Sequence, residues 1–290
     1  MTTNREVDER VESLPQFSTT DRGSRMTSLR PGQPLGRLAP LVPRLLVAWA
    51  LWALTSSVPF DALTGLAPSR EVVMFLTNPI TVAAAIVVAL FGALNQTFQL
   101  HSRAREAFGQ ARVAALLTTV AVTGGFATSA GILVAWTRAS DPAHILNIEA
   151  IATSPEVPLE LGALIGAAFA CWCVIALLSL WGAVAHARRR QHSIEDLRSN
   201  GTAFDGILSA VAFSHHWVHD EPMFRTETTY VADGVSRVIA ARMRTSADRV
   251  PLVGSPMIVR TDGRGAIHVE PDATAEPSFE PEDKYRAPND

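Results

Sequence analysis

Four long apolar stretches constrain the fold of this chain more than any other feature. They cover residues 45–66, 72–94, 113–136 and 161–185 of the 290-residue sequence. Each comes close to the roughly 20 residues that a helix needs to cross the hydrocarbon core of a bilayer. The sequence therefore predicts an α-helical transmembrane bundle of four spans over residues 44–186, surrounded by a lipid bilayer.

Arginines outside these stretches gather on alternate sides of the predicted membrane. Most of them lie before the first stretch, between the second and third, or directly after the fourth: Arg5, Arg10, Arg22, Arg25, Arg30, Arg37, Arg44, Arg103, Arg105, Arg112, Arg188, Arg189 and Arg190. The other two loops hold one arginine each, Arg70 and Arg138. Because cytoplasmic loops are enriched in basic residues, we predict a multi-pass protein with cytoplasmic N- and C-termini. The preference for arginine over lysine, with abundant alanine and valine, is typical of a high-GC bacterium, so the inner (plasma) membrane is the expected location.

Residues 1–43 are rich in Arg, Ser, Thr, Pro and acidic residues and contain few large apolar ones. Such a composition buries too little apolar surface to fold, so we predict a disordered basic N-terminal segment. A cleaved signal peptide is not expected, because its apolar core would lie nearer the start of the chain. Met26 is a second candidate for the initiator. The net charge of −3 gives no indication of nucleic-acid binding.

Small residues recur at intervals of four in two of the spans. Gly162, Gly166 and Ala170 form such a stripe in the fourth span, and Gly125 and Ser129 form one in the third. Small side chains let membrane helices approach one another closely. We interpret the stripes as packing between spans three and four of one chain, with a homo-oligomer interface as the alternative.

The second span contains Asn78-Pro79. Proline removes a backbone donor and interrupts the helical hydrogen bonds, so we predict a kink there. Four threonines in the third span have hydroxyls that can bond to carbonyls of their own helix: Thr118, Thr119, Thr123 and Thr128. The interiors of spans two to four hold no ionisable residue, which argues against ion-coupled transport.

The fourth span is expected to continue beyond the membrane as a cytoplasmic helix over residues 187–200. No helix breaker occurs before Asn200-Gly201, a good C-terminal stop. Arg188, Arg189 and Arg190 lie where anionic lipid headgroups would be. We predict that these three arginines anchor the helix at the membrane surface.

Residues 201–271 have a strand-forming composition. Candidate strands cover residues 206–214, 224–232, 235–244, 254–261 and 266–270. Asp233-Gly234 is a strong hairpin signal, and Asp262-Gly263 is a second turn. These features predict a small C-terminal all-β module, either an antiparallel sheet or a barrel. The acidic, proline-containing residues 272–290 are predicted to form a disordered tail.

Three short motifs carry a resemblance over about 70 residues. They are Asn200-Gly201, residues 229–234 (TYVADG), and residues 250–255 (VPLVGS) with the strand that follows at 257–260. This part of the chain resembles uncharacterised bacterial membrane proteins with a small cytoplasmic β module after transmembrane helices. It is more distantly similar to the OB-like barrels of NfeD-type membrane proteins. The resemblance implies a fold and no known activity; Thr261-Asp262-Gly263 departs from its usual final turn.

The only concentrated set of potential ligands is residues 215–221 (HHWVHDE). His215, His216, His219 and Asp220 are metal-ligand types, and a zinc site needs three or four that converge. In a regular strand His215 and His219 share one face and His216 points away. A metal site, a pH-responsive loop and an ordinary polar strand end are the alternatives.

No phosphate-loop, nucleophile-elbow or zinc-protease motif occurs in the sequence, and no cofactor is predicted. Our first hypothesis is a non-enzymatic membrane anchor or scaffold whose cytoplasmic β module binds a partner protein. The second is an oligomeric channel or transporter. The third is a membrane enzyme that uses the His-rich residues 215–221.

Overall fold

A computed structural model shows the arrangement of the chain and describes residues 15–64, 79–140, 159–218, 221–276, 278–280 and 285. The chain forms two compact units, which we describe separately. The bundle unit comprises Arg37–Glu106 and Val113–Ala183. The β unit comprises Met1–Gly36, Ala107–Arg112 and Val184–Asp290.

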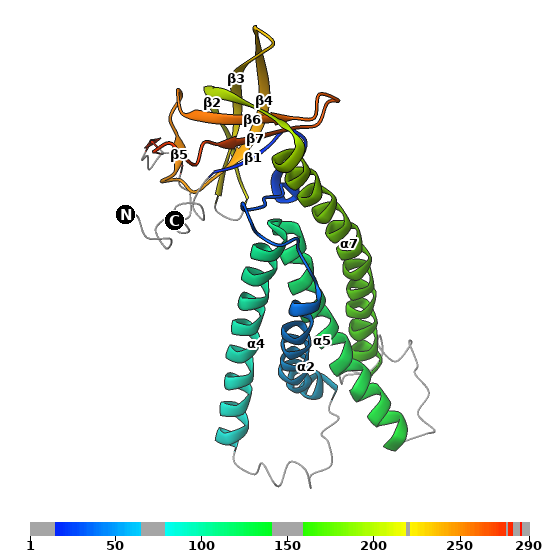
Figure 1. Cartoon of the computed structure of the whole chain (residues 1–290). Helices are drawn as coiled ribbons and strands as arrows, with labels where there is room; N and C mark the ends of the chain where they lie inside the picture. The colour runs from blue at the N-terminus through cyan, green and yellow to red at the C-terminus, as the bar shows by residue number, and fades with distance from the viewer. Residues whose placement is uncertain are drawn as a thin grey trace. The chain divides into compact units, whose positions relative to one another are not determined.

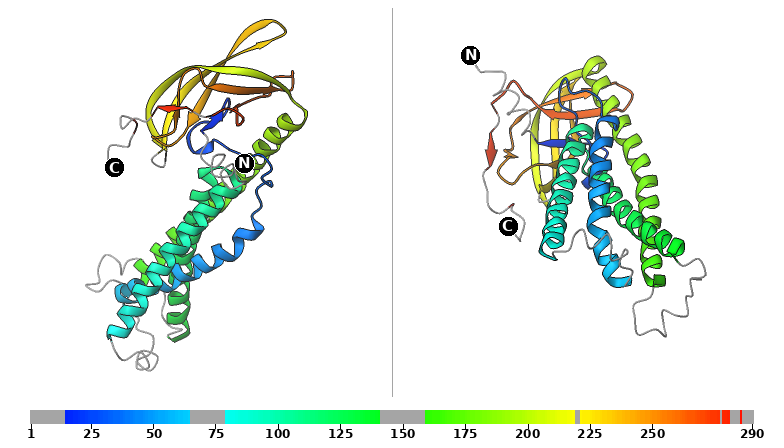
Figure 2. Two further views of the ribbon diagram at one scale, coloured as in Figure 1. Left: turned by 60° about the vertical axis from the view of Figure 1, so that its left-hand side comes forward. Right: turned by 90° about the horizontal axis from the view of Figure 1, so that it is seen from below.

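Four long helices confirm the predicted transmembrane bundle (Figure 1). They are α2 (Val42–Thr64), α4 (Pro79–Phe108), α5 (Ala111–Ser140) and α7 (Leu159–Asn200). Each contains a segment long and apolar enough to cross a membrane. Many of their large apolar side chains are exposed, including Phe98 and Trp181, as expected for a surface covered by lipid. α2, α4 and α5 run alongside one another in both views of Figure 2.

Two tryptophans of α2 join the helices of the bundle. The indole Nε1 of Trp49 donates to Thr128 Oγ1 of α5, and that of Trp52 donates to Thr97 Oγ1 of α4, each at 2.9 Å. A Cβ added at Gly125 of α5 would lie 2.5 Å from the Cβ of Trp52. Small residues on α5 therefore admit the helix α2, a contact that the sequence did not predict.

The small-residue stripes contribute to packing in part. Gly166 of α7 faces Ala130 of α5, because a Cβ added there would lie 2.4 Å from the Ala130 Cβ. Gly162 and Ser129 are also buried, whereas Ala170 is exposed. Gly125 contacts α2 rather than α7, so only part of the stripe on α5 serves the contact between the third and fourth spans.

The predicted kink lies at the edge of the described residues. α4 begins at Pro79 and Asn78 is outside them, so the kink stays a prediction. The hydroxyls of three threonines donate to carbonyls of their own helix, as expected: Thr118, Thr119 and Thr123. Thr128 differs, since it accepts from Trp49.

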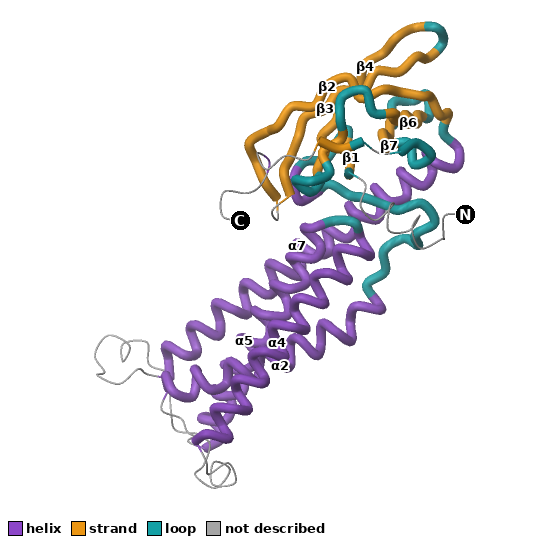
Figure 3. Tube along the Cα trace, turned by 90° about the vertical axis from the view of Figure 1, so that its left-hand side faces the viewer, coloured by secondary structure: helices purple, strands orange, loops and turns teal. Residues whose placement is uncertain are grey.

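The β unit contains a six-stranded antiparallel sheet in the order β1-β4-β3-β2-β6-β7. Its strands are β1 (Gln16–Ser18), β2 (Thr202–Val218), β3 (Glu221–Ala232), β4 (Val235–Arg244), β6 (Pro256–Thr261) and β7 (Ile267–Pro271). The sheet, orange in Figure 3, curls strongly. Its two edge strands approach each other, and Thr19 donates to the Ile267 carbonyl at 3.1 Å. The module is thus nearly a barrel, as predicted.

Alternating residues of these strands build the core inside the curled sheet. Phe224 and Tyr230 of β3, Met243 of β4 and Val259 of β6 are all buried there. Asp233-Gly234 forms the predicted two-residue turn, with both residues at positive φ. This turn aligns β3 with β4 from Ala232↔Val235 onward, which places alternate side chains on the core face and the outer face.

The prediction of disorder over residues 1–43 is wrong for the residues that the structure describes from 15 onward. β1 pairs with β4, and Phe17 is buried against the core of the sheet. One apolar residue in a polar segment carries little weight in a compositional prediction. Pairing with the free edge of β4 gives the segment the hydrogen bonds that its own sequence does not supply.

The prediction of a disordered tail is likewise wrong in part. β8 (Phe279–Glu280) pairs with β5 (Val250–Pro251) in a second, two-stranded sheet. Tyr285 is buried, with its ring 5.1 Å from that of Phe224. The β5–β8 pairing and the buried Tyr285 thus attach the acidic tail to the β unit.

Two fully buried glutamines hold the N-terminal segment within the β unit. Gln110, in the connection between α4 and α5, donates to the Arg25 carbonyl at 2.8 Å. Gln191 of α7 accepts from the Gly36 amide at 2.9 Å and donates to the Ala107 carbonyl at 3.2 Å. The N-terminal segment, this connection and the end of α7 are therefore joined by hydrogen bonds.

Candidate functional site

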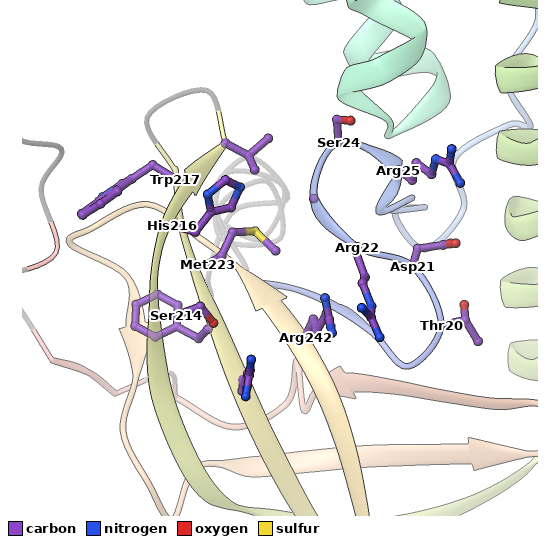
Figure 4. Close-up of a pocket in the computed structure, with 14 residues that line it drawn as sticks. Thr20, Asp21, Arg22, Ser24, Arg25, Ser214, His216, Trp217, Met223 and Arg242 are labelled. Carbon is purple, nitrogen blue, oxygen red and sulfur yellow. The ribbon is translucent and has the colours of Figure 1, made fainter. Parts of the chain in front are cut away.

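An open cavity of about 860 Å³ lies between residues 20–25 and the outer face of the sheet (Figure 4). Strands β2, β3 and β4 provide the rest of its wall. The lining includes four arginines, a histidine and three hydroxyl side chains: Arg22, Arg25, Arg225, Arg242, His216, Thr20, Ser24 and Ser214. We call this cavity the arginine pocket.

The loop over the pocket has a defined local structure. The Asp21 amide donates to Ser18 Oγ at 2.9 Å, which turns the chain directly after β1. The short helix η1 (Gly23–Arg25) follows, and Gln110 holds its last carbonyl. Gly23 has a φ of +55°, a conformation that other residues rarely adopt. These contacts place Arg22 over the strands, beside Arg242 in Figure 4.

Two arginines of the pocket lie directly opposite each other on neighbouring strands. Arg225 of β3 pairs in register with Arg242 of β4, and Arg242 pairs in turn with Ser18 of β1. Like charges directly across an antiparallel pair destabilise a sheet. The chain therefore keeps an arrangement that costs it stability, at the floor of a cavity.

No carboxylate neutralises these arginines within the described residues. Arg22, Arg225 and Arg242 form no ion pair there, and neither does Glu227, two residues beyond Arg225 on β3. Asp21 also lines the pocket, but its carboxylate contacts α7. It lies 3.1 Å from His186 Nε2 and 3.2 Å from Arg190 Nε.

The electrostatics of Arg242 reflect this excess of positive charge. Burial, then the nearby charges of Arg22 and Arg225, lower the pKa of its guanidinium below its ordinary value. A neighbouring arginine has a different environment. Arg244 is almost completely buried, with Nε 3.0 Å from a Glu221 carboxylate oxygen. Buried charges are normally paired in this way. Arg22 and Arg225 are exposed, Arg242 is partly exposed, and none of the three has a carboxylate partner among the described residues.

The His-rich residues do not converge within the described part of the chain. The ring of His215, at a φ of +51°, packs against that of Phe213 with centroids 4.8 Å apart. His216 instead lines the arginine pocket and points toward the loop in Figure 4. His219 and Asp220 lie outside the described residues. Among those described, no three His, Cys, Asp or Glu side chains are grouped to hold a metal.

The three arginines predicted to anchor α7 at the membrane surface have different surroundings. Arg188 donates through Nε to the Gly36 carbonyl at 2.9 Å, and Arg190 pairs with Asp21. Arg189 is exposed. Two of the three thus also hold the N-terminal segment, and an anchoring role for Arg189 stays a prediction.

A second charged cluster joins α7 to the sheet. Arg198 donates to Glu270 Oε2 of β7 from Nε at 3.0 Å and from Nη2 at 2.6 Å, and Arg260 of β6 donates to Oε1 at 3.1 Å. His268 Nε2 lies 3.3 Å from Oε2. Burial alone would raise the pKa of Glu270, but His268 and Arg198 outweigh it and lower that pKa to about 2. Both arginines of this cluster have a carboxylate partner, and we interpret the cluster as structural.

The part of the arginine pocket that the strands form could have been predicted from the sequence. A two-residue turn at Asp233-Gly234 implies that Arg225 faces Arg242, although their pairing was not predicted. Arg22 could not be placed, because its position depends on the pairing of β1 with β4.

No protein family, curated protein or solved structure matches this chain. The resemblance to bacterial membrane proteins with a β module therefore remains a prediction, and the site has to be interpreted from its own geometry.

Proposed function

We propose that this protein is a non-enzymatic membrane anchor whose β module binds an anionic partner in the arginine pocket. The observation that carries the proposal is the cluster of Arg22, Arg225 and Arg242 without a carboxylate partner among the described residues. An anion supplies the charge that this cluster lacks. Guanidinium groups bind anions through charge-assisted hydrogen bonds, which are stronger than hydrogen bonds between neutral groups.

The contacts of the β unit support the proposed topology. The Ser28 amide of the N-terminal segment donates to the Gly109 carbonyl at 3.1 Å, and Gln191 of α7 donates to the Ala107 carbonyl. Three arginine-rich parts of the chain thus meet in one unit, as they must if all lie on one side of a bilayer. The positive-inside rule makes that side the cytoplasm.

The other two hypotheses have less support. The interior threonines that a channel would need are bonded to their own helix or to Trp49. For an enzyme, the described residues of the His-rich segment point to different surroundings. A homo-oligomer has no specific observation in its favour.

The proposal is tested with the full chain purified into nanodiscs. We would measure binding of inorganic phosphate, citrate and a polyglutamate peptide by calorimetry at constant ionic strength, for the wild type and for the double variant Arg225→Gln/Arg242→Gln. The matched control is Arg237→Gln. Arg237 is an exposed arginine that lies on β4, like Arg242, but outside the pocket. We expect at least one anion to bind the wild type and the control and to lose affinity in the double variant. If no anion binds the wild type, the proposed function is wrong.

A further inference from the structure

We propose that the arginine pocket recognises a phosphate monoester group, an inference that rests on the proposed function and narrows it. The feature that carries it is the convergence in the cavity of Arg22, from the loop, with Arg225 and Arg242, from the strands. The alternatives within the proposed function are carboxylate ligands, such as an acidic peptide.

The first step concerns charge. Four arginines line the cavity, while the one carboxylate among its described lining residues, Asp21, is already paired with His186 and Arg190. A carboxylate brings one negative charge. A phosphate monoester brings between about 1.5 and 2 at neutral pH, because its second pKa is near 6. The phosphate group therefore balances more of the excess charge in one ligand.

The second step concerns geometry. A guanidinium presents its N–H groups as a planar fork that matches two oxygens of a phosphate. Arg225 and Arg242 lie side by side on the floor because of the strand register, and Arg22 descends from the loop opposite them. Guanidinium forks that approach from two sides suit the three terminal oxygens of a tetrahedral phosphate. A planar carboxylate offers only two oxygens.

The third step concerns the remaining wall. His216, Ser24 and Ser214 also line the cavity and can donate hydrogen bonds. Met223 and Val218 provide apolar surface beside them. Such a wall accommodates the carbon portion of a phosphate ester next to its charged group. The phosphate can belong to a soluble ester or to a lipid headgroup, which share this chemistry.

The arrangement also predicts an unusual link between stability and binding. Removing one member of the Arg225–Arg242 pair relieves repulsion between like charges across the strands. We therefore expect Arg225→Gln to unfold at the same or a higher temperature than the wild type without ligand, and at a lower one with saturating phosphate ester. An arginine with a purely structural role would lower the unfolding temperature in both conditions.

The experiment uses the full chain in phosphatidylcholine nanodiscs and titrates glycerol 3-phosphate, inorganic phosphate, citrate and polyglutamate. We expect the phosphate compounds to bind more tightly than the carboxylates. We also expect about a tenfold or greater loss in Arg225→Gln/Arg242→Gln, since each charge-assisted contact contributes at least that much, and no loss in Arg237→Gln. Thermal unfolding without ligand verifies that the double variant is folded.

A second arm distinguishes the two sources of phosphate. The glycerol 3-phosphate titration is repeated in nanodiscs that contain one fifth phosphatidate. Reduced apparent affinity there would assign the pocket to a lipid headgroup, whereas unchanged affinity would assign it to a soluble ester. Carboxylates that bind as tightly as phosphate would overturn this inference and leave the proposed function intact. A wild type that binds none of the four would overturn both.

Discussion

Glu270 shows how one residue links the stability of the β unit to pH. Its pKa is lowered to about 2 in the folded chain, from an ordinary value of 4.5. A lowered pKa means that the stabilisation is complete above pH 4.5 and is lost as the pH falls toward 2. We expect Glu270→Gln to lower the free energy of unfolding at pH 7 by roughly 2 to 3 kcal/mol. Chemical unfolding in detergent measures this change.

The control for Glu270 is Glu227→Gln, because Glu227 is exposed and forms no ion pair among the described residues. Its stability should be unchanged at pH 7. Between pH 4.5 and 2 the wild type should lose its advantage over Glu270→Gln. A constant difference between the two proteins across this range would contradict the role assigned to the carboxylate.

Gly109 is the glycine with the least room in the β unit. Its φ is +59°, and a Cβ there would lie 1.9 Å from the Ser28 carbonyl oxygen. Gly32 is a matched control, since its φ is +75° with nothing within 4 Å of an added Cβ. We expect Gly32→Ala to cost about 1 kcal/mol, for backbone strain alone. Gly109→Ala should cost roughly 2 kcal/mol more, because backbone must also move. Similar unfolding temperatures for the two variants would show that the segment adapts freely.

At the scale of elements, α5 admits α2 through a glycine. A Cβ at Gly125 would meet the Cβ of Trp52 at 2.5 Å and the backbone nitrogen of Ala53 at 2.9 Å. We expect Gly125→Ala to destabilise the bundle by about 1 to 3 kcal/mol, because backbone atoms cannot move aside cheaply. Gly131→Ala in the same helix has open space around it and should be neutral or up to about 1 kcal/mol stabilising. Thermal unfolding of both variants in detergent shows whether the close contact with α2, rather than the helix propensity of alanine, determines the change in stability.

Strand β1 is an element whose removal has two consequences. A chain that starts at Met26 lacks Phe17, buried in the core, and the loop residues that include Arg22. The loss of this buried aromatic residue should cost about 3 kcal/mol or more, and β4 becomes an exposed sheet edge. We therefore expect the shortened chain to unfold at a lower temperature and to aggregate more readily than the full chain. Equal thermal stability of the two chains would show that β1 is dispensable.

At the scale of the whole molecule, the prediction concerns which side of the membrane each part occupies. Reporter fusions after Phe108, the end of α4, and at the C-terminus should fluoresce as cytoplasmic proteins do. A fusion after Ser140, the end of α5, should instead activate a periplasmic phosphatase. The fusion after Phe108 tests the positive-inside prediction without strands β2 to β8, which follow later in the chain. Phosphatase activity at the C-terminus would place the arginine pocket outside the cell and contradict the proposed topology.

Much of the fold was predictable because it depends on local signals. The spans follow from uninterrupted apolar residues, and α7 ends at Asn200, where the predicted stop occurs. β4 covers the predicted residues 235–244, because the Asp233-Gly234 turn determines where the strand starts. The α4 helix extends 14 residues beyond the predicted end of its span at residue 94. Hydropathy indicates where the apolar span lies and does not indicate how far the helix continues beyond it.

The sequence by itself determined the four apolar helices, the hairpin register and the composition of the β module, because each depends on neighbouring residues. Only the tertiary structure decided that Phe17 and Tyr285 complete the core, and that Arg22 joins Arg225 and Arg242. Phe17 and Arg22 meet residues about 200 or more positions away in the sequence, and Tyr285 packs against Phe224 on a strand far from the tail. The formation of these contacts depends on which strand edge and which face remain free after the sheet has curled, and no local pattern encodes that.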